Sequence, residues 1–209
     1  MSSPRRLIDG FARFREQHFI KDDALYRELV EQGQTPEILV VACCDARVDP
    51  ALVLDCAPGD LFVIRNVANL VPPAEYHGHY HGTSAALEFG VCKLGIRHII
   101  VLGHAHCGGI QALMQGEAGR GDTFISSWMG IAAPALERAG NELPNAADAD
   151  PGRHCEQQAI LVSLSNLMTF PWIRERVEQQ QLALHGWYFD IEQGCLLGYD
   201  GQTGRFAEL

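Results

Sequence analysis

The sequence predicts an α/β domain built on a central, mainly parallel sheet with flanking helices. Three short runs rich in branched apolar residues, Ile38–Cys43, Leu61–Arg65 and His98–Gly103, are typical of buried strands. A stretch with helical periodicity separates the second run from the third. Because strands that alternate with helices form parallel sheets covered on both faces, this order of elements indicates the fold class.

Two helices are expected before the first strand. Apolar side chains recur at helical spacing from Leu7 to Phe14. A second helix is expected at Ala24–Gln32, because Asp22 or Asp23 can cap its start and Gly33 ends it. We expect residues 1–35 to form an N-terminal helical arm on a single domain that comprises residues 1–209.

Turn and cap signals bound the elements in the middle of the chain. The turn signal Pro58–Asp60 precedes the second strand, and Gly95 ends a helix predicted at Gly82–Leu94. The third strand leads directly into a helix that begins near Cys107. Further helices are expected at Ser126–Arg138, His154–Met168 and 171–181, followed by two C-terminal edge strands around a turn at Glu192–Gly194.

Charge and composition exclude several classes of partner. The net charge is -10 and the sequence pI is about 5.3, so we expect no nucleic-acid partner and no anionic membrane surface. No apolar run approaches the roughly 18 residues that a transmembrane helix needs, and no signal-peptide pattern is present. We therefore expect a cytoplasmic protein whose seven cysteines are reduced thiols.

Two segments with metal-ligand chemistry lie where predicted strands end. The first is "VVACCDAR", which contains Cys43, and the second is "VLGHAHCGG", which contains His104 and Cys107. In parallel α/β sheets, ligands bind outside the carboxyl ends of the strands. His104 and Cys107 are three residues apart, so one helical turn places them on the same face. If the first strand continues, Cys43 shares a face with Asp45 and Arg47, whereas Cys44 faces the opposite side.

A Cys₂His set from these segments is the pattern of a catalytic zinc site, in which three protein ligands leave a fourth position open. Three other interpretations remain. Single Cys and His residues beside strands are more often packing residues than ligands. Cys107 at the start of a helix could instead be a nucleophilic thiol with a lowered pKa. Asp45 and Arg47 could form an ordinary surface ion pair.

Cys43-x-Asp45-x-Arg47 together with His104-x-x-Cys107 resembles the zinc signature of the β-class carbonic anhydrases. The segments "FVIRNVANLVPP", "GTSAALEFGV" and "CEQQAILVSLSNLMTFPWIRERV" extend the similarity to the plant-type subgroup over most of the chain. The resemblance implies reversible hydration of carbon dioxide to bicarbonate and a proton by a metal-bound hydroxide. It also implies one Zn²⁺ per chain, bound by Cys43, His104 and Cys107.

The same resemblance assigns further residues. Asp45 and Arg47 would be the catalytic pair. Substrate would be contacted by Gln34 from a neighbouring subunit, by the backbone amide of Gly108, and by an apolar pocket whose residues are Phe62, Val67 and Phe89. Plant-type relatives usually have tyrosine where this chain has Phe89, so a hydroxyl is missing there.

The family resemblance also implies self-association as a homodimer or a higher even oligomer, with the N-terminal helices wrapped around a partner subunit. Two alternative functions stay open. The same scaffold with a different pocket hydrolyses carbonyl sulfide or carbon disulfide. A non-catalytic zinc- or bicarbonate-binding module is the other alternative, although Asp45, Arg47 and Gln34 argue against it.

Overall fold

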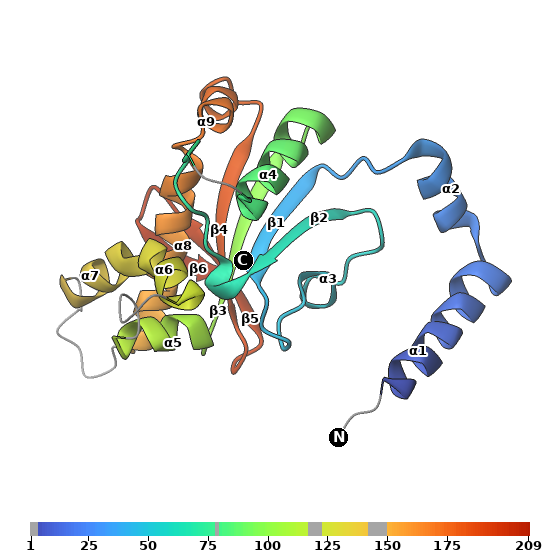
Figure 1. Cartoon of the computed structure of the whole chain (residues 1–209), viewed down its shortest axis with the longest axis horizontal. Helices are drawn as coiled ribbons and strands as arrows, with labels where there is room; N and C mark the ends of the chain where they lie inside the picture. Colours follow the sequence, from blue (N-terminus) through green and yellow to red (C-terminus); the bar gives the residue numbers. More distant parts are fainter. Residues whose placement is uncertain (1–3, 78–79, 117–122, 142–149) are drawn as a thin grey trace. The chain divides into compact units, whose positions relative to one another are not determined.

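The computed structural model describes residues 4–77, 80–116, 123–140 and 150–209. Of residue 141 it describes only the backbone. The chain divides into two compact units, which meet in sequence between Thr35 and Pro36. The first unit is helical, and the second contains the sheet and the remaining helices (Figure 1).

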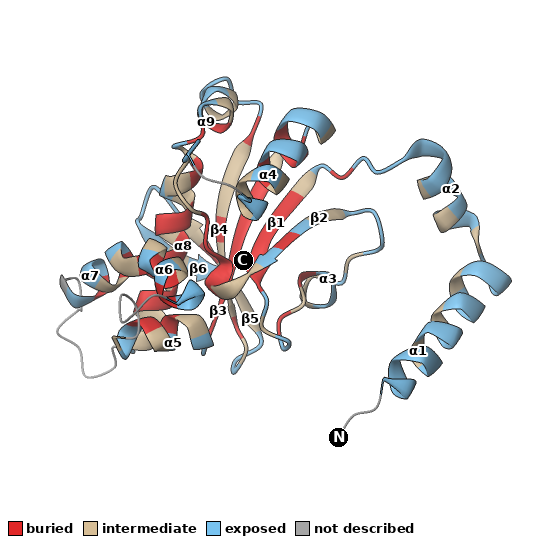
Figure 2. Ribbon diagram, viewed as in Figure 1, coloured by how far each residue is buried: buried red, intermediate tan, exposed pale blue. Residues whose placement is uncertain are grey.

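The helical unit consists of α1 (Arg5–Arg15), a π-helical segment η1 (Glu16–Lys21) and α2 (Ala24–Gln32). Its second helix has the predicted bounds, and Gly33 ends it with a φ of 74°, a conformation that favours glycine. None of the described residues in these three segments is buried, as Figure 2 shows for α1 and α2. The exposed side chains include large apolar ones, so this unit does not bury its own apolar surface.

The second unit is built on a six-stranded sheet with the order β2-β1-β3-β4-β5-β6. The pairs β1–β2, β1–β3 and β3–β4 are parallel, whereas β4–β5 and β5–β6 are antiparallel. The predicted α/β class with a mainly parallel sheet and C-terminal edge strands is therefore confirmed. The strands span Ile38–Cys43 (β1), Leu61–Asn66 (β2), His98–His104 (β3), Ala183–Asp190 (β4), Cys195–Asp200 (β5) and Arg205–Glu208 (β6).

Helices connect these strands. The predicted segment 82–94 is an α-helix for its first half and a π-helix for its second, and the predicted segment 126–138 divides into two α-helices. The elements are α3 (Pro50–Val53), η2 (Val67–Asn69), α4 (Gly82–Glu88), η3 (Phe89–Leu94), α5 (Gly108–Met114), α6 (Phe124–Met129), η4 (Gly130–Ala132), α7 (Ala133–Asn141), α8 (Pro151–Leu167) and α9 (Pro171–Glu178). No helix of the described segments is long and apolar enough to cross a membrane.

Helix α8 packs directly on β3 and β4 (Figure 1). Two glycines make this close approach possible. A Cβ atom on Gly103 would lie 2.7 Å from Ile160 Cδ1, and one on Gly186 would lie 2.9 Å from Ile160 Cγ2. The strands are largely buried, as the red segments of Figure 2 show, and Leu39, Val41, Ile99 and Val101 of the sheet form a buried cluster with Ile160 of α8.

Three features differ from the sequence-based expectation. The first strand ends at Cys43 and does not continue through Asp45. The short helix α3 follows it, because Asp49 caps the backbone N–H of Ala51 at 3.1 Å. The strand β6 was not predicted. It follows a turn in which the Asp200 carboxylate accepts a hydrogen bond from the backbone of Gln202 at 2.8 Å.

Candidate metal centre

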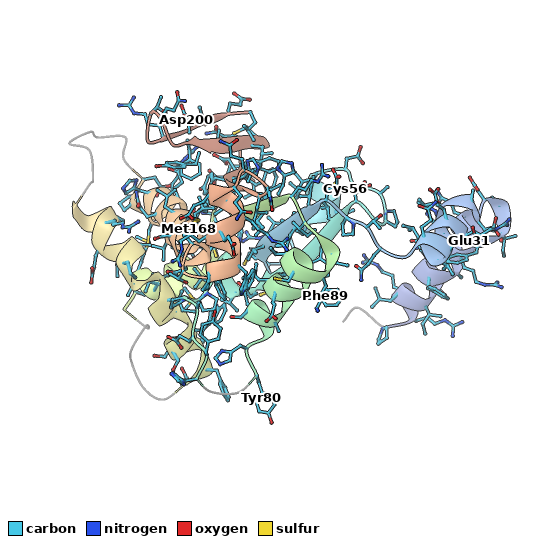
Figure 3. All side chains as sticks on the ribbon, turned by 90° about the horizontal axis from the view of Figure 1, so that it is seen from above. Glu31, Cys56, Tyr80, Phe89, Met168 and Asp200 are labelled. Carbon is cyan, nitrogen blue, oxygen red and sulfur yellow. The ribbon has the colours of Figure 1, made fainter. Side chains whose placement is uncertain are left out.

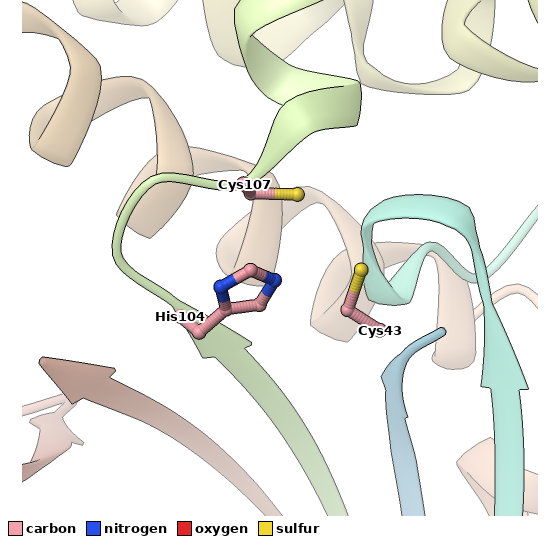
Figure 4. Close-up of side chains that lie close together, drawn as sticks. All are labelled: Cys43, His104 and Cys107. Carbon is pink, nitrogen blue, oxygen red and sulfur yellow. The ribbon is translucent and has the colours of Figure 1, made fainter. Parts of the chain in front are cut away.

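Three side chains with metal-ligand atoms converge at the carboxyl ends of β1 and β3. Cys43 is the last residue of β1, His104 is the last residue of β3, and Cys107 directly precedes α5. Their ligand atoms all lie within 4.8 Å of one another, and Figure 4 shows the three side chains facing the same point. All three residues are buried. The strand order explains this arrangement, because β1 and β3 are parallel neighbours whose ends meet at one edge of the sheet.

His104 is oriented as a metal ligand. Its Nδ1 donates a hydrogen bond to the carbonyl oxygen of Ala105 at 2.9 Å, since a carbonyl can only accept. This bond leaves the lone pair on Nε2, which is buried and has no hydrogen-bond partner among the described residues. Buried polar atoms are rarely left unpaired, so this atom fits a bound cation.

The two thiols share one proton when no metal is bound. The hydrogen bond from Cys107 lowers the pKa of Cys43 to about 4. Conversely, the neighbouring Cys43 thiolate and burial raise the pKa of Cys107. A divalent cation removes the need for this shared proton, because metal ligands are thiolates. Two thiolates and one imidazole therefore form a donor set that suits zinc, with one coordination position left for a substrate.

Cys43 and Cys44 have different surroundings despite being adjacent. Cys43 lies on the same face as the buried residues Leu39 and Val41, whereas Cys44 is exposed. Cys44 is absent from the group of ligand atoms that the described residues form. Its backbone N–H donates to the carbonyl of Asn66 at 2.9 Å, which fixes the chain direction after β1.

Asp45 and Arg47 are joined by a turn and not by strand alternation. Asp45 Oδ1 accepts from the backbone N–H of Arg47 at 2.9 Å and from its Nε at 3.0 Å, and Asp45 Oδ2 accepts from Nη2 at 2.7 Å. The hydrogen bond from Arg47 lowers the pKa of Asp45 well below its usual range. Arg47 Nη2 also donates to the carbonyl of His106 at 3.0 Å, so the pair is attached to the turn between His104 and Cys107.

Arg65 also forms hydrogen bonds with the backbone that follows β1. Its guanidinium donates to the carbonyl oxygens of Cys43 at 3.0 Å and Asp45 at 2.8 Å. It also forms an ion pair with Asp49 at 2.7 Å. Arg65 therefore holds the backbone on both sides of Cys44.

Two of the predicted substrate residues lie beside the three ligand residues. Val67 follows β2 and packs against α5, because its Cγ1 lies 2.9 Å from the position of a Cβ atom on Gly109. The carbonyl of Val67 accepts a hydrogen bond from Trp128 at 2.8 Å. A Cβ atom on Gly108 would meet no atom within 4 Å, so the backbone there is open to a small ligand.

The other predicted substrate residues lie elsewhere in the chain. Phe62 is level with Leu39, four residues before Cys43, which corresponds to roughly 13 Å along the strand. Phe62 stacks on Phe89 with ring centroids 6.1 Å apart, and Phe89, labelled beside the green helical segment in Figure 3, is exposed. Gln34 is exposed and belongs to the helical unit. One copy of the chain thus brings Val67 and Gly108 to the metal ligands and separates Phe62 and Phe89 from them.

Two buried polar residues that support the site, Glu156 and Tyr188, were not identified from the sequence. Glu156 of α8 is 5% exposed, and its Oε1 accepts from the backbone N–H of Cys107 at 2.8 Å. Its Oε2 accepts from the hydroxyl of Tyr188 at 2.8 Å. Burial raises the pKa of Glu156. The one available signal was a carboxylate among buried neighbours at helical spacing, such as Ala159 and Ile160.

Comparison with protein families gives a match over most of the chain. Residues 38–196 match the family model described as carbonic anhydrase. Beta carbonic anhydrase 3 of Arabidopsis thaliana is 38% identical over 197 residues, which cover 93% of this chain and 76% of that protein. Beta carbonic anhydrase 5, chloroplastic, of the same plant is 42% identical over 182 residues, which cover 87% of this chain and 60% of that protein. The chain thus spans about three quarters and three fifths of the lengths of these relatives.

Solved structures with the same fold carry the same family description. The β-carbonic anhydrase CcaA has a TM-score of 0.89 and 35% sequence identity, with 98% of this chain and 91% of that chain covered. A structure from the report of two tetrameric β-carbonic anhydrases of the ascomycete Sordaria macrospora has a TM-score of 0.72 and 29% identity, with 98% and 92% covered. The family model, the curated relatives and the solved structures agree with the resemblance in the sequence, and the chain belongs to the β-class carbonic anhydrases, a family of enzymes.

Proposed function

We propose that this chain catalyses the reversible hydration of carbon dioxide to bicarbonate and a proton, with one zinc ion bound by Cys43, His104 and Cys107. Membership of the β-carbonic anhydrase family supports carbon dioxide hydration as the activity. The observation that carries the proposal is the buried Cys₂His group within 4.8 Å, beside an Asp–Arg pair. Zinc in such a set supplies a Lewis acid that lowers the pKa of a coordinated water.

We assign to Asp45 the role of orienting the water that attacks carbon dioxide. Its pKa is lowered by Arg47, so the carboxylate is ionised throughout the neutral range and accepts a hydrogen bond from that water. Arg47 occupies both carboxylate oxygens in fork geometry and would hold Asp45 back from a metal bound by Cys43, His104 and Cys107. The Asp45–Arg47 pair thereby has a catalytic role and is more than a surface ion pair.

The substrate pocket is proposed to contain residues of two chains. Val67 would supply an apolar wall and Gly108 a backbone N–H for bicarbonate. Phe62, Phe89 and Gln34 would reach the site from a second copy, since Phe62 lies roughly 13 Å from Cys43 along the strand direction in its own chain and stacks on Phe89. The exposed apolar residues of α1, such as Leu7 and Phe11, support self-association as an even oligomer. Tetramers are described for one structurally similar pair of enzymes.

The cytoplasm remains our proposed location for the protein. One of the similar plant proteins is described as chloroplastic, so family membership is compatible with more than one compartment.

Metal analysis and a hydration assay test the proposed function together. We expect about one zinc per chain, rapid acidification when carbon dioxide is mixed with the enzyme in a stopped-flow indicator assay, and loss of that signal after zinc removal. Turnover of carbonyl sulfide in excess of carbon dioxide hydration would support the hydrolase alternative. Zinc without acidification would support a binding module and contradict our proposal.

A further inference from the structure

The peptide unit between His106 and Cys107 is held from both sides by charged side chains. Its carbonyl oxygen accepts from Arg47 Nη2 at 3.0 Å. Its N–H donates to Glu156 Oε1 at 2.8 Å. A peptide unit is planar and its C=O and N–H point in opposite directions, so Arg47 and Glu156 act on one rigid group from opposite sides.

This peptide unit follows a residue in an unfavourable conformation. His106 has a φ of 58°, in the left-handed region that residues with a Cβ atom rarely adopt. Such a conformation persists where surrounding contacts fix it. The hydrogen bonds on either side of the next peptide unit supply those contacts, and they orient the backbone of Cys107 before α5 begins.

Glu156 is itself anchored inside the protein. Its second oxygen accepts from the Tyr188 hydroxyl at 2.8 Å, and Tyr188 is 1% exposed. The nearby Arg153 lies 5.4 Å above the Tyr188 ring and is paired with Asp190 at 2.9 Å. Among the described residues, no ion pair involves Glu156. Each carboxylate oxygen of Glu156 therefore accepts from one neutral donor. Oε2 accepts from the Tyr188 hydroxyl, and Oε1 accepts from the backbone N–H of Cys107, a proposed metal ligand.

A purely structural role does not account for this choice of residue. A carboxylate at 5% exposure is costly to bury, and among the buried residues of α8 Glu156 is the one acidic side chain, beside apolar Cys155, Ala159 and Ile160 and neutral polar Gln158. The arrangement instead resembles the outer contacts of metal sites, which fix the orientation of the ligands.

We infer that Glu156 is a positioning residue that acts through the His106–Cys107 peptide. By fixing this peptide, Glu156 orients the Cys107 thiolate toward the metal. It also fixes the His106 carbonyl, which accepts the hydrogen bond from Arg47. This inference rests on the proposed zinc site and adds a residue to it. The role requires an acceptor oxygen and not a negative charge. Glutamine can meet it, because its oxygen can face the Cys107 N–H while its amide donates to the Tyr188 oxygen.

The test compares four variants by zinc affinity and by the absorption spectrum of the cobalt(II)-substituted protein. Glu156→Ala should weaken zinc binding about 10- to 100-fold and shift the thiolate-to-cobalt bands. Glu156→Gln should match the wild type in both measurements. Tyr188→Phe removes the second anchor of Glu156 and keeps the acceptor for the Cys107 N–H, so it should cause a smaller weakening and a smaller shift of the same bands. Ile173→Val is the control for general destabilisation, because Ile173 is fully buried in α9 and is not among the ligand residues.

The spectrum separates positioning from stability, since loss of core packing does not change the ligand field of a folded metal site. If Glu156→Ala behaves like Ile173→Val in both measurements, the inference is wrong. If Glu156→Ala does not fold, Tyr188→Phe decides, and a spectrum identical to the wild type overturns the inference. An effect of Glu156→Gln as large as that of Glu156→Ala also overturns it. A wild-type chain that binds neither metal would contradict the proposed function itself, which is a different result.

Discussion

Arg47 holds Asp45 by two parallel hydrogen bonds, from Nε to Oδ1 at 3.0 Å and from Nη2 to Oδ2 at 2.7 Å. The same Nη2 donates to the carbonyl of His106 at 3.0 Å, so one guanidinium connects the loop after β1 with the loop after β3. These two loops adjoin Cys43, His104 and Cys107, the three proposed ligands. The orientation of Asp45 is therefore coupled to the geometry of the ligands.

Substitution of either member of this pair should abolish most of the activity and keep the metal. Asp45→Asn removes the carboxylate acceptor, and Arg47→Ala frees Asp45 to approach the metal. We expect carbon dioxide hydration to fall about 10²- to 10⁴-fold in each variant, with zinc content unchanged. Arg97→Ala is a matched control, because Arg97 and Glu37 form an exposed ion pair at 3.8 Å. Wild-type turnover in Asp45→Asn would exclude the assigned role.

Zinc affinity should increase with pH. In the metal-free site Cys43 is already ionised at neutral pH, since its pKa is about 4, whereas Cys107 keeps its proton because its pKa is raised. Binding must release that one proton, so the dissociation constant should fall about tenfold per pH unit. Burial lowers the pKa of His104, but the neighbouring Cys43 thiolate, the Ala105 carbonyl and the Asp45 carboxylate raise it overall, so a second proton is released at the acidic end. Competition with a chelator at several pH values measures this slope, and an affinity independent of pH would contradict it.

Close packing between α8 and the sheet should make Gly186 intolerant of a side chain. A Cβ atom there would lie 2.9 Å from Ile160 Cγ2 and 3.0 Å from Leu164 Cδ1. Gly186→Ala should lower the free energy of unfolding by about 1–3 kcal/mol. Gly140→Ala is the control, because a Cβ atom in that helix meets nothing within 4 Å. It should raise stability by about 0.5–1 kcal/mol. Urea unfolding of both variants gives the comparison, and equal effects would exclude the packing argument.

The apolar side chains of α1 should contribute to self-association. Leu7 and Phe11 are 74% and 62% exposed. A double substitution, Leu7→Asp with Phe11→Asp, should shift the protein to smaller species in light-scattering measurements, because two charges replace apolar surface. Gln17→Asp adds charge at an exposed polar position of the same unit and should leave the mass unchanged. An unchanged mass of the double variant would show that these side chains of α1 do not contribute to self-association.

Local signals predicted much of the fold. A run of branched apolar residues predicted the bounds of β1. Asp22 before the helix and Gly33 after it predicted the bounds of α2. The structure has both elements at these positions. Strand alternation also explains why Cys43 shares a face with Leu39 and Val41, whereas Cys44 follows the strand and is exposed. In contrast, β6 depends on a turn around Asp200, which a pattern of apolar residues does not indicate.

The candidate site was less predictable from sequence where contacts are long-range. Three ligand residues could be grouped because strand ends in a parallel sheet share an edge. The contact between Glu156 and Cys107 joins positions 49 residues apart and depends on how α8 packs against β3, so no local pattern encodes it. Likewise, Phe62 and Phe89 stack on each other and not on Val67. A sequence motif does not indicate which copy of the chain contributes each of these residues to a substrate pocket.

The most direct test of the account is the zinc content and carbon dioxide hydration rate of Cys43→Ala beside those of Cys44→Ala. Cys43 is buried next to His104 and Cys107, whereas Cys44 directly follows the strand and is exposed. We predict that Cys43→Ala loses both zinc and activity, and that Cys44→Ala keeps about one zinc per chain and near wild-type hydration. Retention of zinc and activity by Cys43→Ala, or loss of both by Cys44→Ala, would contradict the proposed metal centre.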